Sequence, residues 1–265
     1  MAERRDVLTR SAPPPDHTVR YGPLPDHVAD VWLPSGGTPR PLVLFLHGGY
    51  WRAAHDRHHV APLAADLAGR GWAVACPEYR RTGGGGGWPA TFEDVAAAVD
   101  AVPGLVEAAA PGRLAPGPAY LAGHSAGGHL ALWSAVRHRL PAGAPGARTR
   151  PPAVRGVLAL APVCDLAETY RRRLDLDAAR ALMGGGPGQL PERYAAVDPA
   201  RLPAPDAPTV MLQGPGDGRV PIVLTREYAR THDVPLIELD GADHFAVIDP
   251  ESAAWPAVVT ALTHL

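Results

Sequence analysis

The feature that most constrains the fold is the pentapeptide Gly123-His124-Ser125-Ala126-Gly127, which lies between a short apolar run and a helix-forming run. The run before it, residues 119–122, predicts a buried strand, and residues 128–136 predict a helix. A serine at such a junction needs a very sharp turn, which leaves no room for a side chain two residues before or after it. This explains Gly123 and Gly127. The pattern predicts a strained serine whose hydroxyl stands above a sheet, with a helix N-terminus behind it that favours negative charge. A glycine-rich turn that happens to contain serine is the alternative.

A second motif follows an earlier apolar run. Residues 42–46 predict a buried parallel strand, and His47-Gly48-Gly49-Tyr50-Trp51 comes directly after it. Glycines at this place let the backbone approach a substrate oxygen. We therefore expect the N–H groups of Gly48 and Gly49 to join that of Ala126 in an oxyanion hole. Tyr50 and Trp51 could stack on a flat leaving group, and core packing beneath the loop is the alternative for this pair.

An acid and a base are expected downstream of the serine. Residues 209–213 predict a strand that leads to Asp217, and residues 236–239 predict a strand that leads to His244. Because the carboxyl ends of parallel strands meet at one edge of a sheet, Ser125, Asp217 and His244 are expected to form a catalytic triad there. Other candidates for the acid are Asp206, Asp240, Asp243 and Asp249.

The remaining patterns alternate between strands and helices. The predicted strands are 27–33, 72–76 and 155–160, and the predicted helices are 58–68 and 91–110, the latter broken at Pro103-Gly104. This alternation predicts an α/β fold with a mostly parallel central sheet and helices on both faces. The run of glycines at residues 83–87 predicts a flexible loop.

The length and the apolar content of 46% suit a single domain over residues 1–265. The Pro-rich residues 1–25 predict an N-terminal arm. Residues 165–205 break the alternation and predict a small cap, or lid, with Tyr170 and Tyr194 at the pocket. A surface excursion without a role in binding is the alternative for this segment.

All 25 basic residues are arginine, so the chain has no lysine for a phosphate-binding loop, a Schiff base or a Ser-Lys dyad. A net charge of −2 gives no electrostatic reason to expect binding to nucleic acid or to a membrane surface. Cys76 and Cys164 lie on or next to predicted strands and suit buried thiols in a reducing compartment. No apolar leader follows Met1, so we expect a cytoplasmic location, and the oligomeric state stays open.

Several histidines could suggest other chemistry. The spacing of His55, His58 and His59 would put two imidazoles on one helical face, but the H-E-x-x-H carboxylate is missing. A solvated helix start is the expected explanation, and we predict no metal and no cofactor. His124 and His129 flank the serine, and we expect His129 to pack behind it and neither to act as the general base.

Together these motifs resemble those of the α/β-hydrolases over residues 41–265, which is most of the chain. Within that superfamily the chain is similar to esterases and lipases with an HGG oxyanion motif, and to kynurenine formamidases (arylformamidases). The positions that carry this resemblance are residues 47–51 and 123–130, Gly214, Asp217, Val220 and Pro221, His244-Phe245 and Asp249-Pro250. Gln213 stands where many relatives have histidine, a departure that we expect to leave the triad untouched.

The resemblance implies a serine hydrolase that cleaves a small ester or an N-formyl aryl amide through an acyl-enzyme, without a cofactor. A general short-chain carboxylesterase is the first alternative, because a short cap offers little apolar wall for a long acyl chain. A non-catalytic small-molecule binder on the same scaffold is a second alternative. A peptidase is disfavoured because the cap leaves little room for a gating domain.

Overall fold

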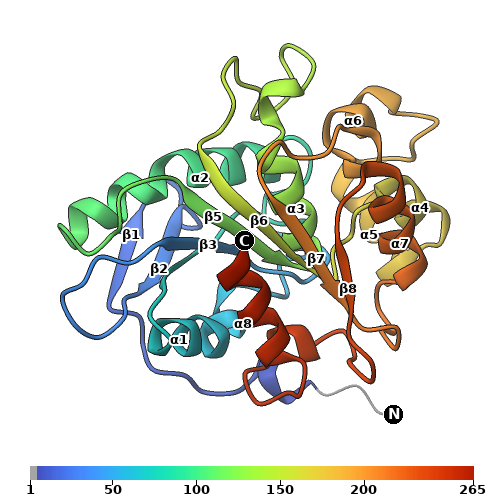
Figure 1. Cartoon of the computed structure of the whole chain (residues 1–265). Coiled ribbons are helices and arrows are strands. Elements are labelled where there is room, and N and C mark those ends of the chain that lie inside the picture. The colour runs from blue at the N-terminus through green and yellow to red at the C-terminus, as the bar shows by residue number, and fades with distance from the viewer. Residues whose placement is uncertain (1–4) are drawn as a thin grey trace.

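The computed structural model describes residues 5–265, and an eight-stranded sheet runs through the centre of this part (Figure 1). The strand order is β1-β2-β4-β3-β5-β6-β7-β8, in which β1–β2 and β2–β4 are antiparallel and all other pairs are parallel. The strands are β1 (His17–Arg20), β2 (Val28–Trp32), β3 (Leu42–Leu46), β4 (Ala73–Pro77), β5 (Ala119–His124), β6 (Val154–Leu160), β7 (Thr209–Gln213) and β8 (Leu236–Glu238). The predicted α/β class with a mostly parallel sheet is confirmed.

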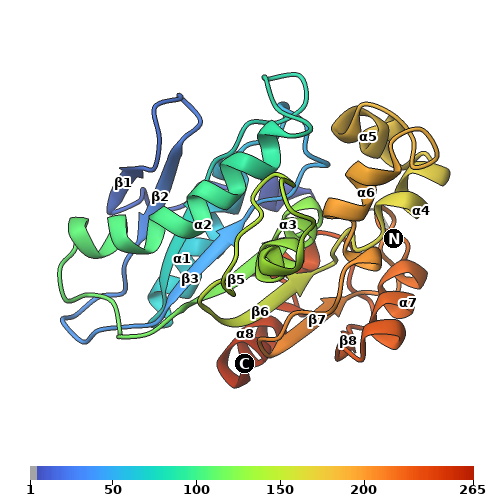
Figure 2. The ribbon, with the colours of Figure 1, turned by 90° about the horizontal axis from the view of Figure 1, so that it is seen from above.

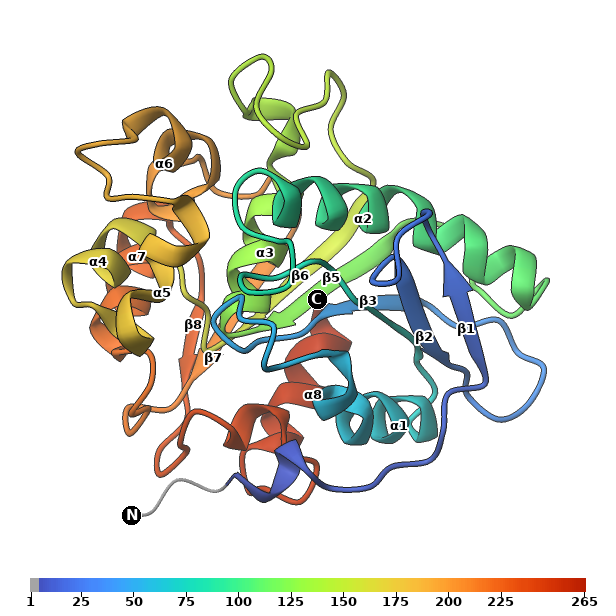
Figure 3. The same cartoon turned by 180° about the vertical axis from the view of Figure 1, so that it is seen from behind.

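Helices cover both faces of the sheet. Helices α2 and α3 lie on one face and α1 and α8 on the other, as the views from above and from behind show (Figures 2 and 3). The α-helices are α1 (Ala61–Gly69), α2 (Ala90–Ala109), α3 (Ala126–Ala135), α4 (Leu166–Arg171), α5 (Leu174–Met183), α6 (Pro191–Val197), α7 (Ile222–His232) and α8 (Trp255–His264). Among the described residues, no helix is both long and apolar enough to cross a membrane.

The two faces of the sheet bury two separate hydrophobic cores, and strand β3 shows why. Its five residues are all apolar and all buried. Leu42, Leu44 and Leu46 pack with α2 and α3, whereas Val43 and Phe45 pack with α1 and α8. Side chains alternate across a strand, so a central strand covered on both faces must be apolar throughout. This double burial fixes the carboxyl end of β3, where the HGG loop begins.

Some sequence-based expectations differ from the structure. Strand β1 lies within the expected N-terminal arm, where only one of its four residues is buried and the pattern is weak. Helix α2 is continuous through Pro103, because Val102 and Val106 on the same helix are fully buried in the core. The glycine run at 83–87 is a hydrogen-bonded turn rather than a loose loop: the N–H groups of Gly84 and Gly86 both donate to the Arg81 carbonyl.

The segment between β6 and β7 folds as three short helices, α4, α5 and α6, which lie beside α7 at one end of the sheet (Figure 1). This segment corresponds to the expected cap at residues 165–205.

Both cysteines are buried and unpaired, and burial raises the pKa of each thiol above its ordinary value. The expectation that no leader is present depends in part on residues 1–4. These residues lie outside the described part of the chain.

Candidate active site

Ser125 occupies the sharp turn between β5 and α3 that the sequence predicts. Its backbone has φ 56° and ψ −118°, a conformation that residues with a side chain rarely adopt. A Cβ atom on Gly123 would lie 2.2 Å from the Gly127 carbonyl oxygen, and one on Gly127 would lie 1.9 Å from the Leu46 carbonyl oxygen. Glycine is therefore required at both positions by backbone contacts. The strained turn sets Ser125 at the N-terminus of α3, where the helix dipole favours an anion.

The predicted base and acid, His244 and Asp217, are in direct contact. The His244 Nδ1 lies 2.8 Å from Asp217 Oδ2, and both side chains are almost fully buried. Asp217 Oδ1 accepts from the backbone N–H groups of Arg219 (2.8 Å) and Val220 (2.9 Å), which orient the carboxylate. Because Nδ1 must donate to the carboxylate, Nε2 is left as the proton acceptor that a general base needs.

The rival carboxylates have other partners. Asp249 pairs with Arg10, and Asp206 pairs with Arg139 and His138. Asp243 accepts from the backbone N–H of Phe245 (3.0 Å) and of Ala246 (2.9 Å). Asp240 is exposed. Asp217 is thus the carboxylate that the structure places on His244.

The HGG loop adopts a conformation that costs backbone strain. Gly49, Tyr50 and Trp51 have φ values of 107°, 49° and 56°, all in the region that favours glycine. A Cβ atom on Gly48 would lie 3.2 Å from the Ser125 Cβ, so the loop backbone lies directly against the serine. This close approach is what an oxyanion hole built from Gly48, Gly49 and Ala126 N–H groups requires.

Ser125 and His244 line one cavity of about 100 Å³. The other residues that line it are Arg5, Leu8, Gly49, Tyr50, His55, His59, His124, Asp175, Arg219 and Phe245. They come from the N-terminal arm, the HGG loop and the segment between it and α1, the end of β5, the cap and the loops after β7 and β8. The arm and the cap therefore both contribute to the pocket.

The aromatic residues expected at the pocket divide into two groups. Tyr50 lines the cavity, and its hydroxyl donates to the Arg219 carbonyl at 2.6 Å. Trp51 is fully buried with its indole edge-on to His129 at 5.2 Å, which is the core packing weighed as its alternative. Tyr194 is also fully buried, donates to the Gly185 carbonyl and, like Tyr170, is not among the residues that line the cavity. Asp175 is the cap residue that reaches it.

Three contacts at the site were not expected from the sequence. Gln213 Nε2 donates to Asp217 Oδ2 at 2.9 Å, so the departure at this position does touch the triad. The buried Thr225 hydroxyl donates to the other end of the Gln213 amide and fixes its orientation. His124 Nε2 donates to the His244 backbone carbonyl at 2.9 Å and so ties the serine turn to the histidine loop. The signal for His124 was its place next to Ser125.

Three other histidines near the serine, His59, His124 and His129, are neutral. Burial lowers the pKa of His59 to about 3 and that of His124 well below its ordinary value. His129 packs behind the serine turn, where burial lowers its pKa to about 4 and Nε2 donates to the Val197 carbonyl. Across residues 5–265 no three histidine, cysteine or acidic side chains are grouped so as to hold a metal ion.

Comparisons with known proteins point to esterases. A truncated carbohydrate esterase from gut microbiota superimposes with a TM-score of 0.75 at 19% identity, covering 100% of this chain and 97% of that one. A thermophilic esterase from the planctomycete Thermogutta terrifontis gives 0.70 at 21% identity, covering 97% and 95%. At these identities the likeness concerns the fold, which is that of the α/β-hydrolases.

One curated relative is more similar in sequence over a shorter stretch. The rice protein (Oryza sativa subsp. japonica) named Probable isoprenylcysteine alpha-carbonyl methylesterase ICME is 34% identical over 116 residues. The match covers 43% of this chain and only 27% of the rice protein. The BD-FAE family model matches residues 29–231, from β2 through α7, and so includes the HGG loop, the serine turn and the acid. The chain therefore belongs to the BD-FAE family of α/β-hydrolases.

Proposed function

We propose that the protein is a serine hydrolase that cleaves carboxylic esters with short acyl groups. The observation that carries this proposal is the arrangement in which Ser125 and His244 line one cavity and Asp217 holds the Nδ1 of His244. A base held in one tautomer beside a strained serine is the arrangement of a nucleophilic acyl-transfer site. The match to the BD-FAE family and the fold of esterases support the same reading.

In the proposed mechanism, Ser125 Oγ attacks the ester carbonyl carbon while His244 Nε2 takes the serine proton. The carbonyl oxygen becomes an oxyanion that accepts hydrogen bonds from the N–H groups of Gly48, Gly49 and Ala126. The tetrahedral intermediate collapses, the C–O bond to the alcohol breaks, and His244 returns its proton to the leaving alcohol. Water, deprotonated by His244, then attacks the acyl-enzyme and releases the acid and free Ser125. Asp217 stabilises the imidazolium throughout.

The size of the cavity limits the acyl group. An apolar cavity of about 150 Å³ holds a benzene molecule. The cavity at Ser125 measures about 100 Å³, and four of its twelve lining side chains belong to histidine. A formyl, acetyl or propionyl group fits this space, whereas a long alkyl chain would find few apolar contacts there.

N-formyl aryl amides are a second candidate substrate class, because formyl is the smallest acyl group and therefore suits the small cavity. Tyr50 and Phe245 both line the cavity, and their rings are available to an aryl leaving group. An amide is a harder substrate than an activated ester. A preference for N-formylkynurenine over p-nitrophenyl esters would therefore be informative.

The proposal is tested by measuring kcat/KM for p-nitrophenyl acetate, butyrate and decanoate and for N-formylkynurenine. We expect kcat/KM for acetate and butyrate to exceed that for decanoate by at least about tenfold, because the small cavity cannot bury the additional methylenes of the longer acyl chain. Ser125→Ala should lower kcat by several orders of magnitude with the fold intact by circular dichroism. A fluorophosphonate should label the native chain at Ser125.

Other outcomes lead to defined corrections. A folded chain that neither turns over any ester nor reacts with the fluorophosphonate contradicts the hydrolase proposal and supports a non-catalytic binder. Turnover of N-formylkynurenine with a higher kcat/KM than that of acetate assigns the formamidase activity instead of the general esterase activity. Best activity with decanoate would contradict the argument from cavity size.

A further inference from the structure

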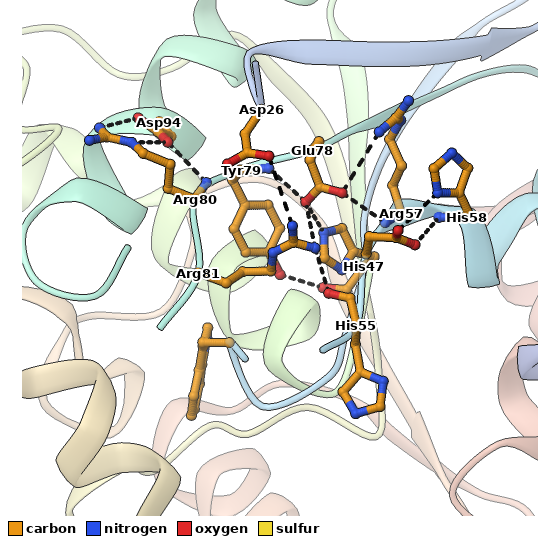
Figure 4. Close-up of polar contacts among 12 residues, drawn as sticks. Asp26, His47, His55, Arg57, His58, Glu78, Tyr79, Arg80, Arg81 and Asp94 are labelled. Carbon is orange, nitrogen blue, oxygen red and sulfur yellow. Dashed lines mark hydrogen bonds and ion pairs between the residues drawn. The ribbon is translucent and has the colours of Figure 1, made fainter. Parts of the chain in front are cut away.

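Glu78, at the end of β4, is a buried carboxylate that the proposed mechanism does not use. It is 2% exposed and lies at the centre of the contacts in Figure 4. Its Oε1 accepts from His47 Nε2 at 2.9 Å and lies 2.9 Å from Arg81 Nη1, and its Oε2 accepts from the Arg57 backbone N–H at 3.0 Å. A carboxylate is buried this deeply only when such partners compensate its desolvation.

One of these contacts, the hydrogen bond with His47, reaches the HGG loop. Its ring donates to Glu78 through Nε2 and to the Gly48 carbonyl through Nδ1, also at 2.9 Å. Both partners are acceptors, so both contacts are hydrogen bonds only when each ring nitrogen carries a proton. The ring also stacks on Tyr79 with a centroid separation of 4.4 Å, and the Tyr79 hydroxyl donates to the His47 carbonyl at 2.7 Å.

These contacts hold the carbonyl oxygens of two successive peptide groups. In a trans peptide the C=O of one residue and the N–H of the next point in opposite directions within one plane. The His47 carbonyl is held by Tyr79, which fixes the direction of the Gly48 N–H. The Gly48 carbonyl is held by the His47 ring, which fixes the direction of the Gly49 N–H. The two N–H groups thus turned away from these anchors are those assigned to the oxyanion hole.

We propose that Glu78 is a positioning residue for the oxyanion hole, acting through His47 and with Tyr79 to aim the N–H groups of Gly48 and Gly49. This inference rests on the proposed function. The loop cannot hold this geometry at no cost, because Gly49, Tyr50 and Trp51 all have positive φ. A fixed anchor behind the loop keeps the donors oriented before the substrate arrives, which is what electrostatic stabilisation of a transition state requires.

Charge keeps Glu78 in the form that this role needs. Burial alone would raise its pKa, but the electrostatic contact and the hydrogen bond with His47, together with the charge of Arg81, lower the pKa to about 2. Glu78 is therefore a carboxylate, with acceptor sites only, over the whole range in which a serine esterase works. The Arg81 guanidinium also donates to the His55 carbonyl, so the network extends to a second residue of the cavity wall.

The test is Glu78→Gln, which keeps the shape of the side chain but removes the charge and replaces one acceptor oxygen by a donor. The loss of one oxyanion-hole donor lowers kcat by about 10²–10³-fold. In Glu78→Gln the N–H groups of Gly48 and Gly49 are misoriented but not removed, so kcat should fall by about 10–100-fold. KM should stay within about threefold, because the oxyanion exists only in the transition state. The inhibition constant of a trifluoromethyl ketone, which forms an oxyanion on Ser125, should rise in parallel with the loss of kcat/KM.

Asp94→Asn is the matched control. Asp94 is also 2% exposed and also pairs with a histidine and an arginine, but these partners, His27 and Arg80, lie outside the HGG loop. Figure 4 shows it beside Arg80, separate from the contacts of Glu78. We expect Asp94→Asn to lower the melting temperature as Glu78→Gln does, while kcat and trifluoromethyl ketone binding stay within about threefold of the native values.

Tyr79→Phe provides a milder variant in case Glu78→Gln does not fold. It removes only the hydroxyl that holds the His47 carbonyl, and should lower kcat by about 3–10-fold with KM unchanged. The proposal is overturned if either folded variant keeps native kcat and ketone affinity, or if Asp94→Asn loses as much kcat as Glu78→Gln. A native chain without esterase activity would instead contradict the proposed function itself.

Discussion

At the residue scale, the grouping of Ser125, Asp217 and His244 could be predicted because each of them follows an apolar run that is typical of a strand. Ser125 follows β5, Asp217 follows β7 and His244 follows β8, and the sheet brings these strand ends to one edge. Gln213 could not be assigned in this way. It is the last residue of β7, and its contact with Asp217 depends on a turn that brings the chain back four residues later. The apolar pattern of residues 209–213 does not indicate that the following turn brings Asp217 into contact with Gln213.

Asp217→Asn tests the acid. An asparagine can donate to Nδ1 rather than accept from it, which favours the wrong His244 tautomer, so kcat should fall on the order of 10⁴-fold. Asp249→Asn is the control, because Asp249 is also a mostly buried carboxylate and pairs with Arg10 in place of a histidine. Its kcat should stay within a few-fold of the native value. A larger loss in Asp249→Asn than in Asp217→Asn would reassign the acid.

At the element scale, strands covered on both faces were predicted best. The expected bounds of β3 and β7 agree with the structure, since a fully buried strand must be a continuous apolar run. Strand β1 was missed because three of its four residues are polar and its pairing with β2 is a tertiary contact. The sequence did not predict the separate helices of the cap. Their ends depend on contacts with distant loops, such as the contact of Asp175 with Arg52.

Arg52 connects the HGG loop to the cap. Its Nε donates to Asp175 Oδ2 at 2.6 Å and its Nη2 donates to the carbonyls of Asp175 and Leu176. These two residues and Asp177 have consecutive positive φ values of 46°, 53° and 64°, a turn that needs such support. Arg52→Gln should therefore raise amide hydrogen exchange across residues 173–177 about tenfold, which corresponds to the loss of charge-assisted hydrogen bonds.

Arg172→Gln is the control for this experiment. Arg172 pairs with Glu168 one turn earlier in α4, so its loss should leave exchange in residues 173–177 nearly unchanged. Equal exchange in the Arg52 variant and the native chain would show that the turn is held by its own packing and not by the HGG loop.

At the scale of the whole molecule, histidines that stay neutral in the folded chain make stability depend on pH. Burial lowers the pKa of His59 to about 3 and of His129 to about 4, from an ordinary value of 6.5. Below pH 6.5 the unfolded chain takes up protons on these residues and the folded chain does not, so stability falls as the pH falls towards 4. Each such histidine contributes a slope of up to about 1.4 kcal/mol per pH unit.

His129→Gln tests this dependence, because glutamine can still donate to the Val197 carbonyl but cannot take up a proton in the unfolded chain. The free energy of unfolding, measured by urea titration at pH 7.5, 6.0 and 5.0, should fall less steeply with acidification in this variant than in the native chain. His58→Gln is the control, since His58 is exposed. A native slope in His129→Gln would contradict the assignment of a neutral buried His129.

The order of the strands has a consequence for how activity arises during folding. The HGG loop follows β3, the serine follows β5, the acid follows β7 and the base follows β8, which are spread over most of the chain but lie in neighbouring places in the sheet. Each parallel pairing between them closes a long loop, and such contacts form slowly. The base arrives with β8, the edge strand and the last in the sequence. Regain of hydrolysis after dilution from denaturant would thus report the completion of the sheet, and a nascent chain that ends before β8 would carry a prepared serine without its proton acceptor.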